Sequence, residues 1–386
     1  MRALDTIAVL AAGAFAARSL HVALCSNDRI EPVEPSDDLP PLSIVVPARD
    51  EERQIEGCVR SLLAQRYPHL EVVVVDDRSS DATHAILARL AREDDRLRIV
   101  TGEPLPRGWV GKPWALHQGA RRASGEWLLF TDADTVHEPL AAASAMRYAR
   151  DRKLGALSLL STQDLGSLAE RAVLPSILWA IACGAGPLAD VNDASKSGSA
   201  LFNGQYILMR ADAYAAIGGH EAVKGEIAED FELAHLLKTD GRYRTMLVGA
   251  NDLVRTRMYR NLREIWNGFG KNLALGARGN PLVLAAGVGF LAFVAPVPQL
   301  LLLRALQRRR YREAAWMGGA TVATMLAAEV GMRRSRFPRG SGAWLPVGLT
   351  IMLGILLDSA YRHAGGRGVR WRGRRYGARL GPSPEG

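Results

Sequence analysis

The sequence has 386 residues, 48% of them apolar and 23% charged, which suits roughly two to three folded domains and excludes a disordered chain. The net charge of +9 is uneven, because residues 304–386 carry +12 and residues 1–303 carry −3. That distribution, without a zinc-finger, recognition-helix or aromatic RNA motif, argues against nucleic acid as a partner. Three scattered cysteines exclude a disulfide framework and a cysteine zinc site.

The amino-terminal residues 1–24 are expected to form a membrane anchor. Residues 7–24 are apolar apart from Arg18 and His21. A cleaved secretory signal is the alternative, but Arg2 is followed closely by Asp5 and no good small-residue cleavage site follows His21. Residues 25–41 are polar and rich in proline, which indicates a linker.

The next segment, residues 42–280, alternates short apolar runs with amphipathic stretches. Buried strands alternating with helices predict a doubly wound α/β sheet, which binds ligands beyond the carboxyl ends of its strands. The expected strands are 42–47, 71–75, 97–100 and 127–131, and the expected helices are 51–66, 81–92 and 113–123.

Acidic residues follow two of these strands. Asp76 and Asp77 follow the second strand, and Asp132 and Asp134 form a D-x-D triplet after the fourth. Neither strand end carries a dinucleotide or P-loop glycine motif. Carboxylates at this position suit a hard divalent cation, although a D-x-D triplet also occurs by chance, and turn or helix capping is an alternative for Asp76 and Asp81.

Two further places carry candidate chemistry. The loop 108–112 ends in a cation, Lys112, just before a helix, which suits a phosphate, although an ordinary surface loop is the alternative. Glu229 and Asp230 precede a helical pattern, where they could serve the reaction or only complement the helix dipole.

The carboxyl-terminal part is expected to lie in the membrane. Residues 281–361 contain three apolar segments near the ~20 residues that a spanning helix needs. These are 281–303, which either spans or re-enters, and 314–331 and 343–361, both expected to span; an Arg-rich tail follows at 362–386. A further uncharged run, 172–189, lies between Asp132 and Asp230 and is expected to stay at the interface.

The order of these motifs resembles family 2 glycosyltransferases of the GT-A fold. The membrane segments make the chain similar to bacterial enzymes that glycosylate carotenoid- or hopanoid-type lipids, and more distantly to ceramide glucosyltransferases. The motifs that carry the resemblance are VVPARDEE (45–52), VVDDRSSDAT (74–83), GWVGKPWAL (108–116), FTDAD (130–134) and AEDFEL (228–233).

The resemblance implies a role for each matching residue. Asp230 would be the general base of an inverting transfer. Asp132 and Asp134 would hold a divalent cation, Mg²⁺ or Mn²⁺, and the donor diphosphate. Donor binding would also involve Pro47, Glu51, Asp76, Asp77 and Lys112.

The family's Q-x-x-R-W motif has no clean copy in this sequence. Residues 260–266 read RNLREIW, so Arg263 and Trp266, together with Glu229, are only possible contacts for the diphosphate or the acceptor. A basic amphipathic helix at the membrane surface is the alternative for Arg263 and Trp266.

The expected function is transfer of a sugar from a nucleotide-sugar donor, a UDP-sugar, to a hydroxyl or carboxyl of a membrane lipid. Alternatives are a polysaccharide synthase and a catalytically dead membrane scaffold. We expect a multi-pass protein of the inner membrane with a cytoplasmic catalytic domain. A re-entrant 281–303 is favoured, because it keeps the Arg clusters at 304–312 and 362–379 on the cytoplasmic side.

Overall fold

The computed structural model describes residues 3–26, 28–271, 273, 280–364, 369–371 and 374–376. Most of the Arg-rich tail expected at 362–386 therefore lies outside the described residues. The chain divides into two compact units, each built from separate stretches. The sheet unit comprises Asp28–Asp164, Leu188–Met258 and Gly368–Gly386, and the helical unit comprises Met1–Asn27, Leu165–Pro187 and Tyr259–Arg367.

Two stretches belong to the helical unit although both lie inside the segment expected to form the catalytic domain. They are residues 165–187 and the described residues from 259 to 273.

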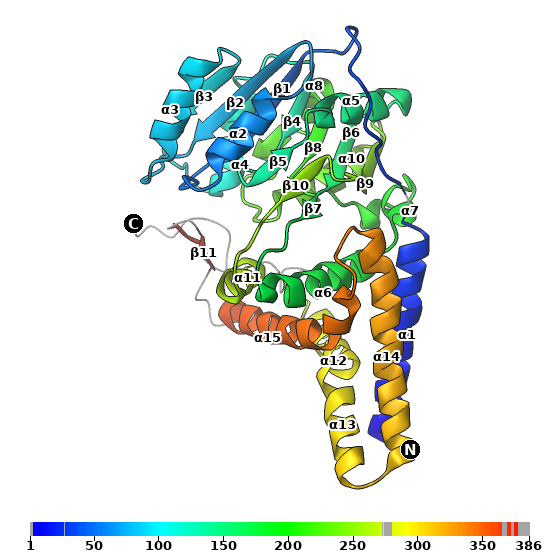
Figure 1. Ribbon diagram of the computed structural model, residues 1–386. Coiled ribbons are helices and arrows are strands. Elements are labelled where there is room, and N and C mark those ends of the chain that lie inside the picture. The colour runs from blue at the N-terminus through cyan, green and yellow to red at the C-terminus, as the bar shows by residue number, and fades with distance from the viewer. Residues whose placement is uncertain are drawn as a thin grey trace. The chain divides into compact units, whose positions relative to one another are not determined.

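The sheet unit is built on a seven-stranded sheet, which confirms the predicted doubly wound α/β fold (Figure 1). All neighbouring strands pair in parallel except β8, which is antiparallel to both β4 and β6. In spatial order the strands are β3 (Leu97–Thr101), β2 (Leu70–Asp76), β1 (Leu42–Ala48), β4 (Trp127–Phe130), β8 (Ile207–Arg210), β6 (Ala156–Leu160) and β9 (Thr245–Gly249).

Helices cover both faces of this sheet because successive strand residues point to opposite sides. Ile44 and Val46 face a core that includes α2 and α5, whereas Val45 faces a second core with Leu116 of α4. Gly119 of α4 lies against Val45 so closely that a Cβ there would collide with it. The helices are α2 (Ile55–Leu63), α3 (Thr83–Glu93), α4 (Gly111–Ala120), α5 (Ala141–Asp151), α7 (Leu188–Val191), α8 (Ala211–Ala216), α9 (Gly219–Ala222) and α10 (Glu229–Asp240).

A second, three-stranded sheet lies next to the D-x-D triplet in sequence. It consists of β5 (Thr135–His137), β10 (Val254–Thr256) and β7 (Thr162–Gln163), with β10 in the middle. The Thr256 hydroxyl donates to the backbone carbonyl of Asp134 at 3.1 Å. This contact helps to fix the backbone that carries the triplet.

The helical unit contains four helices that are long and apolar enough to cross a membrane, among the residues that the structure describes. They are Ala3–Leu24, Leu168–Ala185, Pro281–Gln307 and Ser341–Arg362, whereas α14 is not among them. Its α-helices are α1 (Ala3–Leu24), α6 (Leu168–Ala185), α11 (Leu262–Phe269), α12 (Pro281–Val294), α13 (Pro296–Gln307), α14 (Tyr311–Arg334) and α15 (Leu345–Ala364). The strands β11 (Val369–Trp371) and β12 (Arg374–Tyr376), which pair with each other, belong to the sheet unit.

Helices α1 and α14 lie side by side and run in the same direction (Figure 1). At one end Arg334 donates to the Ala23 carbonyl at 2.9 Å. At the other end Leu4 and Asp5 line a pocket together with residues of the α13–α14 turn. The chain therefore reaches the turn 304–310 at the end of α1 opposite Ala23. Whether 281–303 re-enters or spans a membrane stays a prediction.

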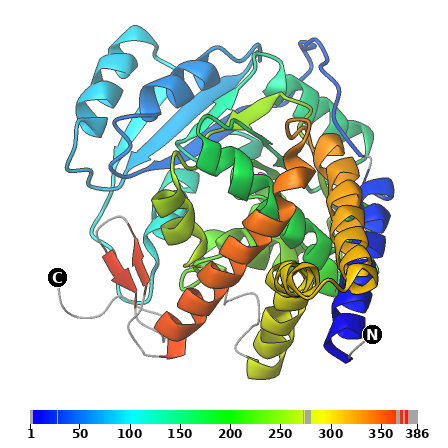
Figure 2. The same ribbon diagram turned by 60° about the horizontal axis from the view of Figure 1, so that its bottom comes forward.

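Helices α6 and α15 run across α1 and α14 instead of along them (Figures 1 and 2). They cross near the Ala23 end, where the Trp179 indole of α6 donates to Ser19 Oγ at 2.6 Å. The same ring packs against Gly331 of α14. By length and apolar composition, α6 and α15 are candidates for spanning a membrane. Within the helical unit, however, they run in a different direction from α1.

Candidate active site

The carboxyl edge of the sheet collects most of the predicted site residues. Asp76 ends β2 in register with Ala48 of β1, and Asp132 follows β4, the strand on the other side of β1. The Thr131 N–H still donates to the Val45 carbonyl at 3.2 Å, so the sheet holds the chain up to the start of the triplet. Parallel packing therefore brings two acidic strand ends that are distant in sequence to one edge.

Asp76 is buried and both of its carboxylate oxygens have hydrogen-bond partners. Oδ1 accepts the Ser79 N–H at 3.0 Å, and Oδ2 lies 3.0 Å from His84 Nδ1. Asp77 lies beside Arg49, whose Nη1 donates to the Asp77 carbonyl at 2.7 Å and is 4.0 Å from its carboxylate. Asp76 thus contacts the backbone of its own turn, and Arg49 brings a cation beside Asp77.

Pro47 and Glu51 lie on the neighbouring segment. Pro47 pairs in register with Val75, one residue before Asp76, and is half-buried. The Glu51 N–H donates to Thr83 Oγ1 at 2.8 Å. Asp81 accepts N–H groups from Thr83 at 3.0 Å and from Glu52 at 3.1 Å, so capping is what the structure shows for it.

A buried polar network contacts the backbone of the D-x-D triplet. Thr131 and Thr135 hydroxyls lie 3.1 and 3.0 Å from His137 Nε2, and Thr135 donates to the Asp132 carbonyl at 2.8 Å. Burial lowers the pKa of His137 to about 3, so the ring is neutral. Cys58 lies in the same network, where burial raises the pKa of its thiol to about 12. Because its groups are uncharged, this network fixes the backbone of Asp132 without forming an ion pair with the Asp132 carboxylate.

Lys112 joins the triplet to the acidic pair on α10. Its Nζ lies 2.8 Å from Asp132 Oδ1 and 2.8 Å from Glu229 Oε1. Burial alone would lower the pKa of Lys112, but the carboxylates of Asp132 and Glu229 outweigh it and raise the pKa well above its usual value. In this structure the cation of the loop 108–112 thus contacts two carboxylates, and its expected contact with a phosphate stays a prediction.

Asp230 sits at the first turn of α10, beside this ion-paired group. Its Oδ2 accepts the Gly204 N–H at 2.9 Å and its Oδ1 accepts the Phe231 N–H at 3.0 Å. Withdrawal of the carboxyl group from water raises the pKa of Asp230 to about 7, with a further rise from Glu229; the charge of Lys112 and the Gly204 N–H act in the opposite direction. A carboxyl group with this pKa can take up a proton near neutral pH.

Sequence reasoning missed Gly204. This residue precedes β8, and a Cβ there would lie 3.0 Å from Lys112 Nζ and 3.1 Å from Asp230 Oδ2. Glycine thus lets the backbone approach both side chains closely, and a larger residue would require one of them to shift by a few tenths of an ångström. The signal in the sequence was a glycine just before an apolar run, but only the antiparallel insertion of β8 between β4 and β6 brings it to this edge.

The residues fit a divalent cation only as a partial set of ligands. Within the part of the chain that the structure describes, no three His, Cys, Asp or Glu side chains converge as a ready-made metal site. Asp132 and Asp134 are half-buried carboxylates two residues apart, and Asp132 already contacts a cationic group. Mg²⁺ is commonly bound by one or two carboxylates plus substrate phosphates, and this pair of carboxylates fits that pattern.

Arg263 and Trp266 belong to the helical unit, in a different compact unit from Asp230. Both lie on α11, which begins after Asn261, whose side chain accepts the Glu264 N–H at 3.0 Å. The Trp266 indole donates to Asp358 Oδ2 at 2.7 Å, and Asp358 is ion-paired with Arg362 on the same helix, α15. Arg263 is exposed. The structure thus gives Trp266 a partner inside the helical unit and leaves the side chain of Arg263 facing solvent.

Comparison with known proteins finds a family and several enzymes to which this chain is similar. Residues 43–160 match the family model described as glycosyl transferase family 2. A 4,4'-diaponeurosporenoate glycosyltransferase of Staphylococcus haemolyticus is 28% identical over 240 residues, which are 61% of this chain and 62% of that protein. The enzyme of the same name from Staphylococcus aureus strain USA300 is 27% identical over 249 residues, 64% of each chain. The chain thus matches slightly less than two thirds of these relatives.

Among solved structures, the mannosyltransferase PcManGT from Pyrobaculum calidifontis, in complex with GDP-Man and Mn²⁺, is similar with a TM-score of 0.53. The match has 18% sequence identity and covers 93% of this chain and 98% of that one. At this identity the likeness concerns the fold alone. Residues 43–160 are thus similar to glycosyl transferase family 2, and the fold of the chain is like that of GT-A glycosyltransferases.

Proposed function

We propose that this protein transfers a sugar from a nucleotide-sugar donor to a hydroxyl or carboxyl group of a membrane lipid, with inversion at the anomeric carbon. The names of the staphylococcal relatives support a carotenoid-type lipid as acceptor. Four helices apolar enough to span a membrane, on a chain with a sugar-transfer domain, favour an acceptor that is itself apolar. A UDP-sugar is our proposed donor.

The observation that carries this proposal is the position of Asp230. Its carboxylate is held by the Gly204 N–H, and Lys112 links its neighbour Glu229 to Asp132. In an inverting transfer, one base removes the proton of the acceptor while the acceptor oxygen attacks the sugar opposite the leaving diphosphate. With a pKa of about 7, Asp230 is a suitable base at neutral pH.

The donor would lie along the carboxyl edge of the sheet. Asp76 and Asp77, with Pro47 and Glu51 beside them, would hold the nucleoside. Asp132 and Asp134 would hold a divalent cation, Mg²⁺ or Mn²⁺, which offsets negative charge on the leaving diphosphate when bound. PcManGT, solved with GDP-Man and Mn²⁺, supports this by its fold. Lys112 would keep Asp132 and Glu229 aligned until the phosphates arrive.

The arrangement of the helical unit supports a topology with three crossings. At 1.5 Å per residue, α1 and α14 are about 33 and 36 Å long, enough for a hydrocarbon core of about 30 Å. Since α14 runs along α1, both would cross, and α12 and α13 would return the chain to the turn 304–310. Helices α6 and α15, which run across them, would lie near the membrane surface.

The side of the membrane follows from the location of the donor. Nucleotide sugars are cytoplasmic, so the sheet unit, the Ala23 end of α1 and the Arg-rich residues 333–339 would be cytoplasmic. The tail 362–386 would also be cytoplasmic, in line with the positive-inside tendency. Only the turn 304–312 and the amino-terminal end of α1 would lie outside. This differs from the re-entrant scheme in its path but leaves the carboxyl terminus on the same side.

The alternatives predict different results in one experiment. Membranes containing the protein are incubated with labelled nucleotide sugars and a lipid extract, and labelled products are identified. We expect one labelled lipid, absent with Asp230→Asn. A labelled polymer would favour a polysaccharide synthase, and no product with any donor would favour a membrane scaffold. Label in a lipid that persists with Asp230→Asn would reject Asp230 as the base.

A further inference from the structure

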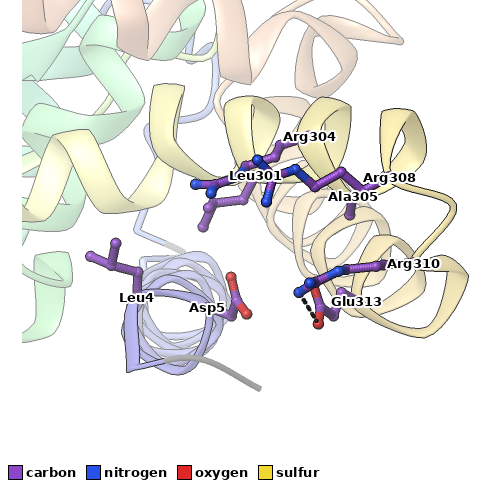
Figure 3. Close-up of a pocket in the computed structure, with 8 residues that line it drawn as sticks. All are labelled: Leu4, Asp5, Leu301, Arg304, Ala305, Arg308, Arg310 and Glu313. Atoms are coloured by element: carbon purple, nitrogen blue, oxygen red, sulfur yellow. Dashed lines mark hydrogen bonds and ion pairs between the residues drawn. The ribbon is translucent and has the colours of Figure 1, made fainter.

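The turn between α13 and α14 forms a charged pocket with the first residues of α1 (Figure 3). The pocket has a cavity volume of about 50 Å³, and Asp5, Arg304, Arg308, Arg310 and Glu313 contribute its charged groups. These side chains come from α1, from the end of α13 and from the start of α14, so the pocket exists only where α1 meets the α13–α14 turn. No residue in it belongs to the sheet unit.

The charges in this pocket are not balanced. Arg310 pairs with Glu313 at 3.2 Å. Arg304, on α13, and Arg308, just after it, have no ion pair with any residue that the structure describes. Figure 3 shows Arg304 and Arg308 on one side of the pocket and Asp5, which is only 5% exposed, on the other. Three guanidinium groups against two carboxylates leave a net positive charge that suits one anionic group.

Exposed apolar and aromatic side chains lie on the same three helices as the pocket. Leu4 lines the pocket and is 53% exposed, and two large aromatic residues lie close to the turn on α14. Aromatic side chains of this kind are typical of the level of lipid headgroups, with cations beside them. The exposed apolar and aromatic residues around the turn are Leu4, Ile7, Leu300, Leu303, Leu306, Tyr311 and Trp316.

We propose that this pocket binds the headgroup of an anionic phospholipid, with the phosphate on Arg304 and Arg308 and a headgroup hydroxyl on Asp5. A guanidinium binds a phosphate oxygen through charge-assisted hydrogen bonds, and a carboxylate accepts a hydrogen bond from a hydroxyl. A hydroxylated headgroup such as that of phosphatidylglycerol matches both. The apolar rim provides contact for the acyl chains, which a free phosphate ion lacks. The site is independent of the proposed sugar transfer.

The test uses the full-length protein, purified in a neutral detergent and delipidated. Binding of phosphatidylglycerol, phosphatidylcholine and inorganic phosphate is measured by native mass spectrometry and by the shift in thermal unfolding. The variant is Arg304→Gln with Arg308→Gln. The matched control is Arg309→Gln with Arg312→Gln, which removes the same charge from the same turn but leaves the pocket lining unchanged.

We expect the wild type and the control pair to bind phosphatidylglycerol in preference to phosphatidylcholine. The pocket pair should lose about tenfold or more in affinity, since hydrogen bonds to charged groups are individually worth that much. Equal losses in both pairs would show unspecific attraction of charge to the turn and would overturn the proposal. The proposal would also be overturned if inorganic phosphate raised the thermal unfolding temperature as much as phosphatidylglycerol does.

Discussion

The ammonium group of Lys112 lies 2.8 Å from the carboxylate of Glu229, the residue immediately before Asp230. The same ammonium lies 2.8 Å from Asp132, at the end of a strand in the centre of the sheet. One side chain thus connects the acidic strand end with the first turn of α10. Changes at the triplet, the loop 108–112 or α10 should therefore affect one another.

Asp230→Asn should reduce turnover by about 10²–10⁴-fold, because it removes a general base and keeps the shape of the side chain. Donor binding should change little, since Asp230 contacts Gly204 and Phe231 in this structure. Single-turnover rates and donor titrations measure the two effects. Glu232→Gln, on the same helix, is the control and should keep full turnover. More than half of the wild-type rate in Asp230→Asn would contradict the assignment.

The rate should depend on pH through the ionisation of Asp230. Its raised pKa of about 7 means that the reactive, deprotonated form is lost as the pH falls below 7, so kcat/KM should rise with pH through that region. The charge of Lys112 lowers the pKa of Asp230, so Lys112→Met should move the rise to higher pH. Lys112→Arg keeps the charge and should move it less. An unchanged profile in Lys112→Met would contradict the coupling.

Gly204→Ala should impair turnover, because the new Cβ would lie 3.0 Å from Lys112 Nζ and 3.1 Å from Asp230 Oδ2. One of these side chains must then shift, and the N–H that holds Asp230 shifts with it. Gly198→Ala is the matched control, since nothing lies within 4 Å of its Cβ position. We expect similar thermal unfolding but different turnover for the two variants. Equal turnover would show that the contact has no part in the reaction.

Much of the sheet unit could be predicted from the sequence because its signals are local. The apolar runs that become β1, β2 and β4 are short and buried on both faces, and such runs indicate parallel strands. Gly204 gave no comparable signal, because its role depends on β8 pairing with strands that are distant in sequence. The path of α13 could not be predicted either, since it depends on packing against α14 and on contacts with Leu4 and Asp5.

Removal of divalent cations should abolish transfer. The fit of Asp132 and Asp134 to a cation with a diphosphate predicts that a chelator stops the reaction and that Mn²⁺ or Mg²⁺ restores it. Asp134→Ala should weaken donor binding when the cation is present and have little effect when it is absent. The measurement is a donor titration with and without the cation. Full transfer in excess chelator would contradict the proposal that the reaction needs a divalent cation.

The topology can be checked by labelling single cysteines in intact cells with a maleimide that does not cross membranes. Cys25, Cys58 and Cys183 are first replaced by serine or alanine, and the protein must keep its transfer activity. Arg309→Cys, in the turn between α13 and α14, should be labelled from outside. Ser335→Cys, one residue after the Arg334 contact with Ala23, should be labelled only after the cells are opened.

These two positions lie at opposite ends of α14, a helix of 24 residues that spans about 36 Å, so a crossing helix must place them on different sides. A re-entrant 281–303 would instead keep Arg309 on the cytoplasmic side, where the maleimide cannot reach it. Labelling of Ser335→Cys alone from outside would mean that the protein has the opposite orientation in the membrane. Labelling of both positions from outside would show that α14 does not cross, and the parallel packing of α1 and α14 would then apply to two helices on one side of the bilayer.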